Sequence, residues 1–122
     1  TYFVLETLDN LRKAGRLTRV QSIVTGALHI KLLMGATPEG EICKKGQAMS
    51  VKQALNKMVA LMADDLKHVG KRLSIVHCNC LERAFYVKEL AMKQCRFDEI
   101  LVSDTGGIST MYANDGGIVV AY

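Results

Sequence analysis

The sequence has no tryptophan, a single proline and few aromatic residues, which make up 6% of the chain. It also has no apolar run approaching the roughly 18 residues that are needed to cross a bilayer. The longest apolar stretches, 27–36 and 118–122, are too short, and His29 and Lys31 interrupt the first of them. The chain is therefore not expected to span a membrane. Its hydrophobic fraction of 49%, its charged fraction of 23% and its six methionines are typical of a soluble globular protein with an aliphatic core.

A length of 122 residues is enough for one domain with one core, and too little for two domains of ordinary size. We therefore expect a single domain over residues 1–122. Residues 1–5 have neither an initiator methionine nor the features of a signal sequence, and we interpret them as a strand. We expect such a chain to be part of a longer protein.

The charge balance is mildly basic, with 16 Lys and Arg against 12 Asp and Glu and a net charge of +4. This excess of positive charge is smaller than is typical of nucleic-acid-binding proteins, so we expect no nucleic-acid partner. The four cysteines, at 43, 78, 80 and 95, do not form a pattern typical of a disulfide framework in a chain of this size. We therefore expect the protein to be cytoplasmic, in a reducing compartment.

Strand-like and helix-like segments alternate along the chain. The strand-like segments are 2–5, 29–36, 41–49, 73–77, 100–103 and 117–122, with a further extended piece expected from residue 108. The stretch Thr37-Pro38-Glu39-Gly40 has the pattern of a turn, which predicts a hairpin between the second and third strands. Thr7 and Thr18 are predicted to cap short helices, the first ending at Gly15 and the second covering 20–28.

Two longer helices have stronger signals. Ser50 is the predicted N-cap of a helix with a regular apolar face that ends at Gly70. Asn79 and Glu82 have the spacing of a capping pair and open another helix. The residues of this helix that are expected to face the core are Leu81, Ala84, Phe85, Ala91, Met92 and Cys95. Together the segments predict an α/β fold, a two-layer domain with a mixed, largely antiparallel sheet of five to six strands covered by helices.

Several residue types could carry chemistry, but none forms a complete site. The stretch His77-Cys78-Asn79-Cys80 contains zinc-ligand types, yet a structural zinc needs four ligands, so we predict no metal site. Cys80 lies close to a predicted helix N-terminus, a position that can lower the pKa of a thiol. Neither Gly106-Gly107 nor Gly116-Gly117 is expected to open a helix, and the second pair fits a tight turn. A small hydrolase or transferase that uses Cys80 or these glycine-rich loops remains the alternative interpretation.

Three stretches resemble one known family. They are YFVLETLDNLRKAGRLTRVQSIVTGALHIKLLMGATPEGEI, GQAMSVKQAL and the ending GGISTMYANDGGIVVAY. Read together, they resemble the C-terminal domain of the DegV family of bacterial fatty-acid-binding proteins, over essentially all 122 residues. The resemblance implies a two-domain protein whose N-terminal domain is absent here and whose long-chain fatty acid lies in a tunnel between or through the domains. It also implies a carrier without catalytic residues or cofactors, which presents the acid to a fatty acid kinase for acyl-phosphate and phospholipid synthesis.

The resemblance also assigns a ligand site. In the commoner family pattern a His followed by a Gly-Pro-Gly turn precedes the last strand, and here Tyr112 takes the place of the His and Asn114-Asp115-Gly116 that of the turn. A tyrosine can donate a hydrogen bond to a carboxylate but supplies no positive charge near neutral pH. The residues expected to bind the fatty acid are Tyr112, Met111, Thr110, Asn114, Ile23, Gly26, Ala27 and Met34. The other interpretation of the apolar residues among them is that they only pack against the sheet.

A local basic cluster is formed by Arg12, Lys13, Arg16 and Arg19. Arg12, Arg16 and Arg19 are expected to be solvated, to contact the absent domain, or to dock the kinase, because charge at a rim mainly raises association rates. An isolated domain would also expose the apolar face that its partner domain covers, and such a patch can drive dimerisation.

Overall fold

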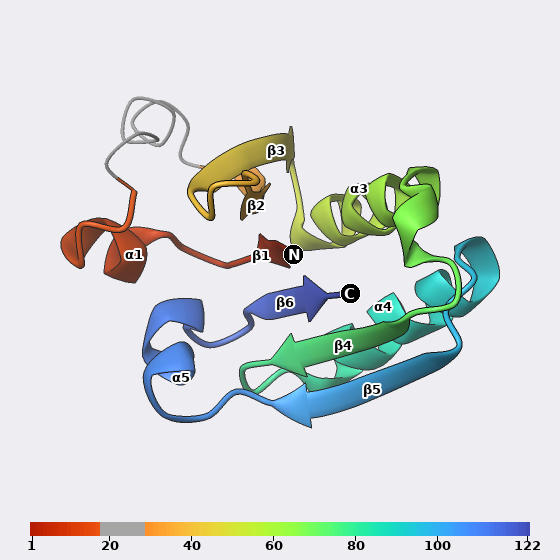
Figure 1. The fold of residues 1–122 in the computed structure, drawn as a ribbon. Coiled ribbons are helices and arrows are strands. Elements are labelled where there is room, and N and C mark those ends of the chain that lie inside the picture. The colour runs from red at the N-terminus through yellow and green to blue at the C-terminus, as the bar shows by residue number, and fades with distance from the viewer. Residues whose placement is uncertain (18–28) are drawn as a thin grey trace.

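The computed structural model describes residues 1–17 and 29–122, so the predicted helix at 20–28 lies outside the described residues. Within these two ranges, six strands form one sheet in the order β3-β2-β1-β6-β4-β5 (Figure 1). The strands are β1 (Tyr2–Val4), β2 (Lys31–Ala36), β3 (Ile42–Ala48), β4 (Arg72–His77), β5 (Glu99–Asp104) and β6 (Ile118–Ala121). Neighbouring strands are antiparallel except β4 and β5, which are parallel. The predicted mixed, largely antiparallel sheet is confirmed, as is the hairpin between β2 and β3.

The last strand of the chain lies in the middle of the sheet. β6 pairs with β1 on one side, where Val119 lies opposite Phe3, and with β4 on the other, where Val119 lies opposite Val76. It therefore joins the antiparallel group β1–β3 to the parallel pair β4 and β5. The first and last strands of the chain are direct neighbours, and without β6 the sheet would fall into two separate parts.

Helices lie on both sides of the sheet. They are α1 (Asp9–Lys13), α3 (Val51–Asp64), α4 (Leu81–Gln94) and α5 (Gly107–Ala113), with a short 3₁₀ turn at Leu66–His68. α3 and α4 pack against each other and against the strands, whereas α1 and α5 lie together at one end of the sheet, on the left in Figure 1. No helix in the described ranges is long and apolar enough to cross a membrane.

The larger hydrophobic core fills the space between the sheet and the helices α3 and α4. Alternate strand residues such as Leu73 and Ile75 of β4 point into it and are fully buried. α3 supplies the buried residues Ala54, Leu55, Met58, Val59 and Met62 at helical spacing. Ser50 caps α3 as predicted, because its side chain accepts a hydrogen bond from the N–H of Gln53.

A smaller apolar cluster, which we call the end cluster, lies on the opposite face beside α1 and α5. Its buried residues are Leu5, Leu8, Leu11, Leu17, Leu32, Met34, Cys78 and Ala113. Phe3 and Tyr112 are partly buried against it. The end cluster therefore connects the short helices to the sheet where α3 and α4 do not reach.

The predicted end of the long helix α3 is wrong. The helix stops at Asp64, and the 3₁₀ turn follows before Gly70. The buried ring of His68 fixes this early end, because its Nδ1 lies 2.6 Å from the Asp65 carbonyl oxygen and its Nε2 accepts the Arg96 N–H at 2.9 Å. Since Nε2 accepts, Nδ1 carries the proton and donates to Asp65.

Two predictions for α4 are also wrong. Asn79 does not cap the helix, because its φ of 51° is left-handed and its amide donates to Asp115. Cys80 takes the N-cap position, but its side chain makes no capping hydrogen bond. The predicted core residues Leu81, Phe85 and Met92 are exposed. The buried face of α4 carries the smaller residues Ala84, Val87 and Ala91, which let the helix approach the sheet closely.

An ionic cluster ties the loop after β1 to β2 and α4. The Glu6 carboxylate accepts a hydrogen bond from Lys31 Nζ at 2.6 Å and pairs with Arg83 at 2.6 Å. Arg83 also donates to the Gly116 carbonyl oxygen at 2.8 Å. Burial by itself would raise the pKa of Glu6, but the hydrogen bonds and charges of Lys31 and Arg83 outweigh it and hold the pKa below 4.5.

Replacing the core residue Ile75 by Ala should lower the free energy of unfolding by about 3 kcal/mol, because it leaves a cavity in the fully buried face of β4. Urea titration monitored by circular dichroism measures the change. The control is Met92→Ala on the exposed side of α4, for which a change of about 0.5 kcal/mol or less is expected. Equal losses for the two variants would contradict the described core.

Glu6→Gln should lower stability at neutral pH by on the order of 1 kcal/mol, since the ion pairs of Glu6 are partly exposed. The pKa of Glu6 is lower in the folded state than in the unfolded chain. The stabilisation that Glu6 gives the fold is therefore present above about pH 4.5 and is lost as the pH falls through the folded-state pKa. The difference between Glu6→Gln and the parent chain should therefore shrink with acidification. Glu89→Gln, on the exposed side of α4, is the control, and a pH-independent difference for Glu6→Gln would disprove the assignment.

Candidate functional site

A row of apolar side chains crosses the face of the sheet opposite α3 and α4. The strand register aligns Met34 with Phe3, Phe3 with Val119, and Val119 with Val76. These residues alternate with the core residues of their strands, so they point to the other face. Met34 is fully buried in the end cluster, whereas Phe3, Val119 and Val76 are half-buried. The row runs from the end cluster into a more open part of the sheet.

The open part of the sheet is largely apolar, and the described residues leave it uncovered. We call Phe3, Val76, Leu101 and Val119 the open face. Leu101 of β5 is 48% exposed; it lies opposite Ser74 of β4, and Val76 is two residues further along that strand, opposite Ser103. The apolar side chains share this face with Ser74 and Ser103. A partly exposed, largely apolar surface of this kind is typical of a site that a ligand or another part of the protein covers.

α5 borders this site at the end of the sheet. Ile108 and Met111 are 66% and 51% exposed, while Tyr112 and Ala113 pack against the end cluster. The extended piece predicted from residue 108 is therefore wrong, and so is the expectation that Gly106-Gly107 opens no helix. Gly107, with a φ of +50°, allows the chain to turn directly from β5 into α5.

Tyr112 is the polar residue that lies next to the apolar row. Its ring packs against the end cluster, which contains Met34 and which Phe3 also borders. Within residues 1–17 and 29–122 its hydroxyl group has no hydrogen-bond partner. A phenol in this position is available to donate a hydrogen bond to a ligand oxygen.

The turn between α5 and β6 has the predicted form. Asn114 has a φ of 57° and Gly116 a φ of 82°, and the Gly117 N–H donates to the Asn114 carbonyl. A Cβ atom on Gly117 would lie 2.5 Å from the Ala113 carbonyl oxygen, so only glycine fits. The second glycine pair is thus required by turn geometry, as the sequence indicates.

The geometry of Cys80 does not support nucleophilic catalysis. Its thiol donates to the Gly117 carbonyl oxygen at 3.4 Å, and burial raises its pKa, contrary to the lowered value expected at a helix N-terminus. The neighbouring His77 Nδ1 accepts the Cys80 backbone N–H instead of the thiol proton. Among the described residues, no group of His, Cys, Asp or Glu side chains could hold a metal ion.

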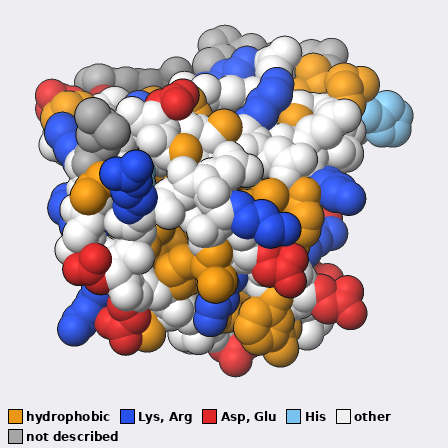
Figure 2. Space-filling view, turned by 90° about the vertical axis from the view of Figure 1, so that its right-hand side faces the viewer, with side chains coloured by type: hydrophobic (Ala, Val, Ile, Leu, Met, Phe, Trp, Pro, Cys, Tyr) orange, Lys and Arg blue, Asp and Glu red, His pale blue; other side chains and the backbone are white. Residues whose placement is uncertain are grey.

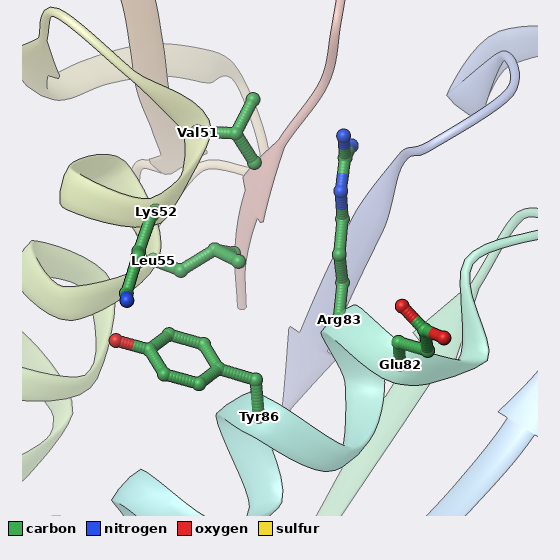
Figure 3. A pocket seen from close by; sticks show the side chains of 6 residues that line it. All are labelled: Val51, Lys52, Leu55, Glu82, Arg83 and Tyr86. Atoms are coloured by element: carbon green, nitrogen blue, oxygen red, sulfur yellow. The ribbon is translucent and has the colours of Figure 1, made fainter.

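A hollow of about 350 Å³ lies elsewhere, between the first turns of α3 and α4 (Figure 3). Its lining residues are Val51, Lys52, Leu55, Glu82, Arg83 and Tyr86. Lys52 lies 5.5 Å from the centre of the Tyr86 ring, and the Arg83 guanidinium is held by Glu6 and Gly116. Both cations already have partners, so this hollow is less suited to an anionic lipid than the open face.

On the right-hand side of the molecule in Figure 1, charged and apolar side chains are mixed. Figure 2 views that side directly, and there Lys, Arg, Asp and Glu side chains are interspersed with small, separate apolar patches. Such a mixture is typical of a solvated surface. The open face and α5 are therefore the better candidate for a ligand.

The structure brings some of the predicted ligand residues together and separates others. Tyr112 borders the end cluster and Met34 lies inside it, so Met34 cannot line an open site without a rearrangement. Met111 and Thr110 are exposed on α5, where Thr110 Oγ1 donates to Thr105 Oγ1. Asn114 follows α5 in the turn. The predicted ligand residues Ile23, Gly26 and Ala27 lie outside the described residues.

The predicted docking arginines have different positions. Arg12 is exposed and pairs with Asp9 at 3.1 Å on the same helix. Arg16 is also exposed, just after Gly15, whose φ of +69° ends the helical region as predicted. Arg19 lies outside the described residues.

Sequence reasoning missed the open face itself. Val76, Leu101 and Val119 each lie in a segment predicted as a strand, between residues that point into the larger core. The alternation of strand side chains could have placed them on the opposite face. It could not have shown that the described helices leave this face open, because that depends on helix packing.

Three comparisons with known proteins agree with this fold. The family model described as "Uncharacterised protein, DegV family" matches residues 1–122. A DegV domain-containing protein of Streptococcus pyogenes serotype M3 is 28% identical over 120 residues, which cover 98% of this chain and 42% of that protein. The chain thus spans less than half the length of this relative.

Two solved structures are similar as well. A DegV-family protein from Ruminococcus gnavus with vaccenic acid is 52% identical, with a TM-score of 0.91, over 98% of this chain and 42% of that one. The Streptococcus pneumoniae fatty acid kinase (Fak) B3 protein, loaded with linoleic acid, is 25% identical, with a TM-score of 0.76, over 99% and 43%. With a family model that matches its whole length, the chain belongs to the DegV family.

Proposed function

We propose that this chain forms one wall of a binding site for a long-chain fatty acid. The observation that supports the proposal most directly is the apolar row that leads from the end cluster to the open face. Beside it lies the Tyr112 hydroxyl, which has no hydrogen-bond partner within residues 1–17 and 29–122. An acyl chain gains roughly 0.8 kcal/mol for each buried CH2 group, which the half-buried valines and Leu101 can supply. The fatty acids present in the two similar structures support the same ligand class.

The other wall of the site belongs to a part of the protein outside this chain. Because the chain spans 42% of its relatives, we assign it to the C-terminal domain of a two-domain protein whose N-terminal domain covers the open face. A 122-residue fragment would leave that face exposed, which favours dimerisation and weak lipid binding. The length and saturation of the acyl chain then depend on both domains.

Binding and presentation fit the site better than catalysis. Cys80, the candidate nucleophile, has a raised pKa and donates its thiol proton to a carbonyl, and this disfavours the hydrolase or transferase alternative. We assign the protein to the cytoplasm as a carrier that needs no cofactor and presents its fatty acid to a fatty acid kinase. The exposed Arg12 and Arg16 are candidate docking residues, with Arg19 as a third by sequence position.

The full-length protein should carry a long-chain fatty acid when it is purified from bacteria, visible in native mass spectrometry as added mass. Leu101→Asp should abolish this mass, because it places a carboxylate under the acyl chain. The matched control is Leu81→Asp, since Leu81 on α4 is 49% exposed, close to the 48% of Leu101, but lies outside the open face. A full-length protein that is empty and cannot be loaded with any fatty acid would refute the proposed function.

Tyr112→Phe in the full-length protein should weaken fatty-acid binding about fivefold, the effect of losing one hydrogen bond worth about 1 kcal/mol. Binding of the corresponding methyl ester, which lacks the carboxylate, should change little. The control is Tyr86→Phe, which removes a hydroxyl that bonds to Asn56 in the helical layer. If Tyr112→Phe binds the fatty acid as tightly as the parent protein does, Tyr112 does not contact the carboxylate.

A further inference from the structure

Among the residues that the structure describes, few contacts hold α5 in place. It has only seven residues, and of these only Tyr112 and Ala113 pack against the end cluster. Its N-cap, Gly106, makes no side-chain hydrogen bond. So short a helix has little stability of its own, and its position depends on contacts with neighbouring elements.

Asn10 of α1 supplies a polar contact that bridges the two short helices. Its Nδ2 donates to the Met111 carbonyl oxygen at 2.7 Å and to Asn114 Oδ1 at 2.7 Å. The Met111 carbonyl is among the last four of α5, which have no partner within the helix, so Asn10 satisfies it from outside. The left-handed backbone of Asn114 brings the second acceptor to the same amide group.

We propose that Asn10 is a positioning residue that clamps α5 and thereby holds Tyr112 and Met111 at the edge of the ligand site; this inference rests on the proposed function. Along the chain, Tyr112 lies between the two residues that accept hydrogen bonds in the clamp, Met111 and Asn114. Loss of the clamp lets α5 move about Gly106-Gly107 on one side and the turn at 114–117 on the other. The clamp slows the release of the ligand without touching it.

The chemistry of the clamp requires an amide at position 10. Both hydrogen bonds start from one NH2 group, which has two protons to give, and both acceptors are carbonyl oxygens. An aspartate at position 10 has similar size, but its ionised carboxylate accepts only and faces two oxygens. Asn10→Asp should therefore behave like Asn10→Ala, although it preserves the shape of the side chain.

The test uses the full-length protein loaded with vaccenic acid. Asn10→Ala and Asn10→Asp should each speed the release of the acid about five- to tenfold, the effect of losing one or two hydrogen bonds. Hydrogen exchange of the amides in 107–114 should rise by a similar factor, with no rise in β4 or β6. Asn114→Gly keeps the left-handed backbone but removes one acceptor of the clamp. In the double variant with Asn10→Ala, it should therefore increase the release rate by a smaller factor than it does alone.

Asn56→Ala is the matched control, because Asn56 also makes a side-chain hydrogen bond at the surface, to Tyr86, but lies on α3. It should leave release and exchange in α5 unchanged. The inference is overturned if Asn10→Ala alters release no more than Asn56→Ala, or if exchange rises equally throughout the sheet. If exchange in 107–114 rises but the parent protein binds no vaccenic acid, the clamp on α5 stands while the proposed function and the effect on release are both refuted.

Discussion

The pairing of β6 with both β1 and β4 is the constraint on which the rest of the structure depends. Val119 lies opposite Phe3 on one side and Val76 on the other, so a four-residue strand joins the two halves of the sheet. The same pairing completes both faces, because Ile118 and Val120 enter the larger core while Val119 joins the open face. The turn before β6, where only glycine fits at position 117, sets its register and also places α5 at the end of the sheet.

The two faces of the sheet are covered differently. α3 and α4 close one face with a dense aliphatic core, in which small residues such as Ala84 and Ala91 allow close packing. On the other face the described residues close only the end beside α1 and α5, through the end cluster. A fatty acid matches the remainder, because its tail needs a dry apolar surface and its carboxylate needs one donor at the border. Near that border, Arg83 of α4 pairs with Glu6 in the loop after β1 and donates a hydrogen bond to the Gly116 carbonyl oxygen in the turn before β6.

The fold was largely predictable from the sequence, because strand alternation and the Ser50 cap are local signals. α5 was not, since Gly106-Gly107 has no cap side chain and the helix depends on packing of Tyr112 and Ala113. The faces of α4 were misassigned because apolar residues occur on two sides of it, and only the sheet decides which side is buried. For the site, the family resemblance pointed to Tyr112. The Asn10 contact and the pairing of Phe3 with Val119 in the open face each join residues more than 100 positions apart.

A crystal structure of the full-length protein with vaccenic acid bound is the most direct test of the proposed fatty-acid site. The acyl chain should lie within about 4.5 Å of Val76 and Val119, the distance of apolar contact, with its carboxylate at the α5 end of the sheet near Tyr112. A fatty acid bound in the hollow between α3 and α4, or an open face covered by protein side chains with no lipid between, would contradict this prediction.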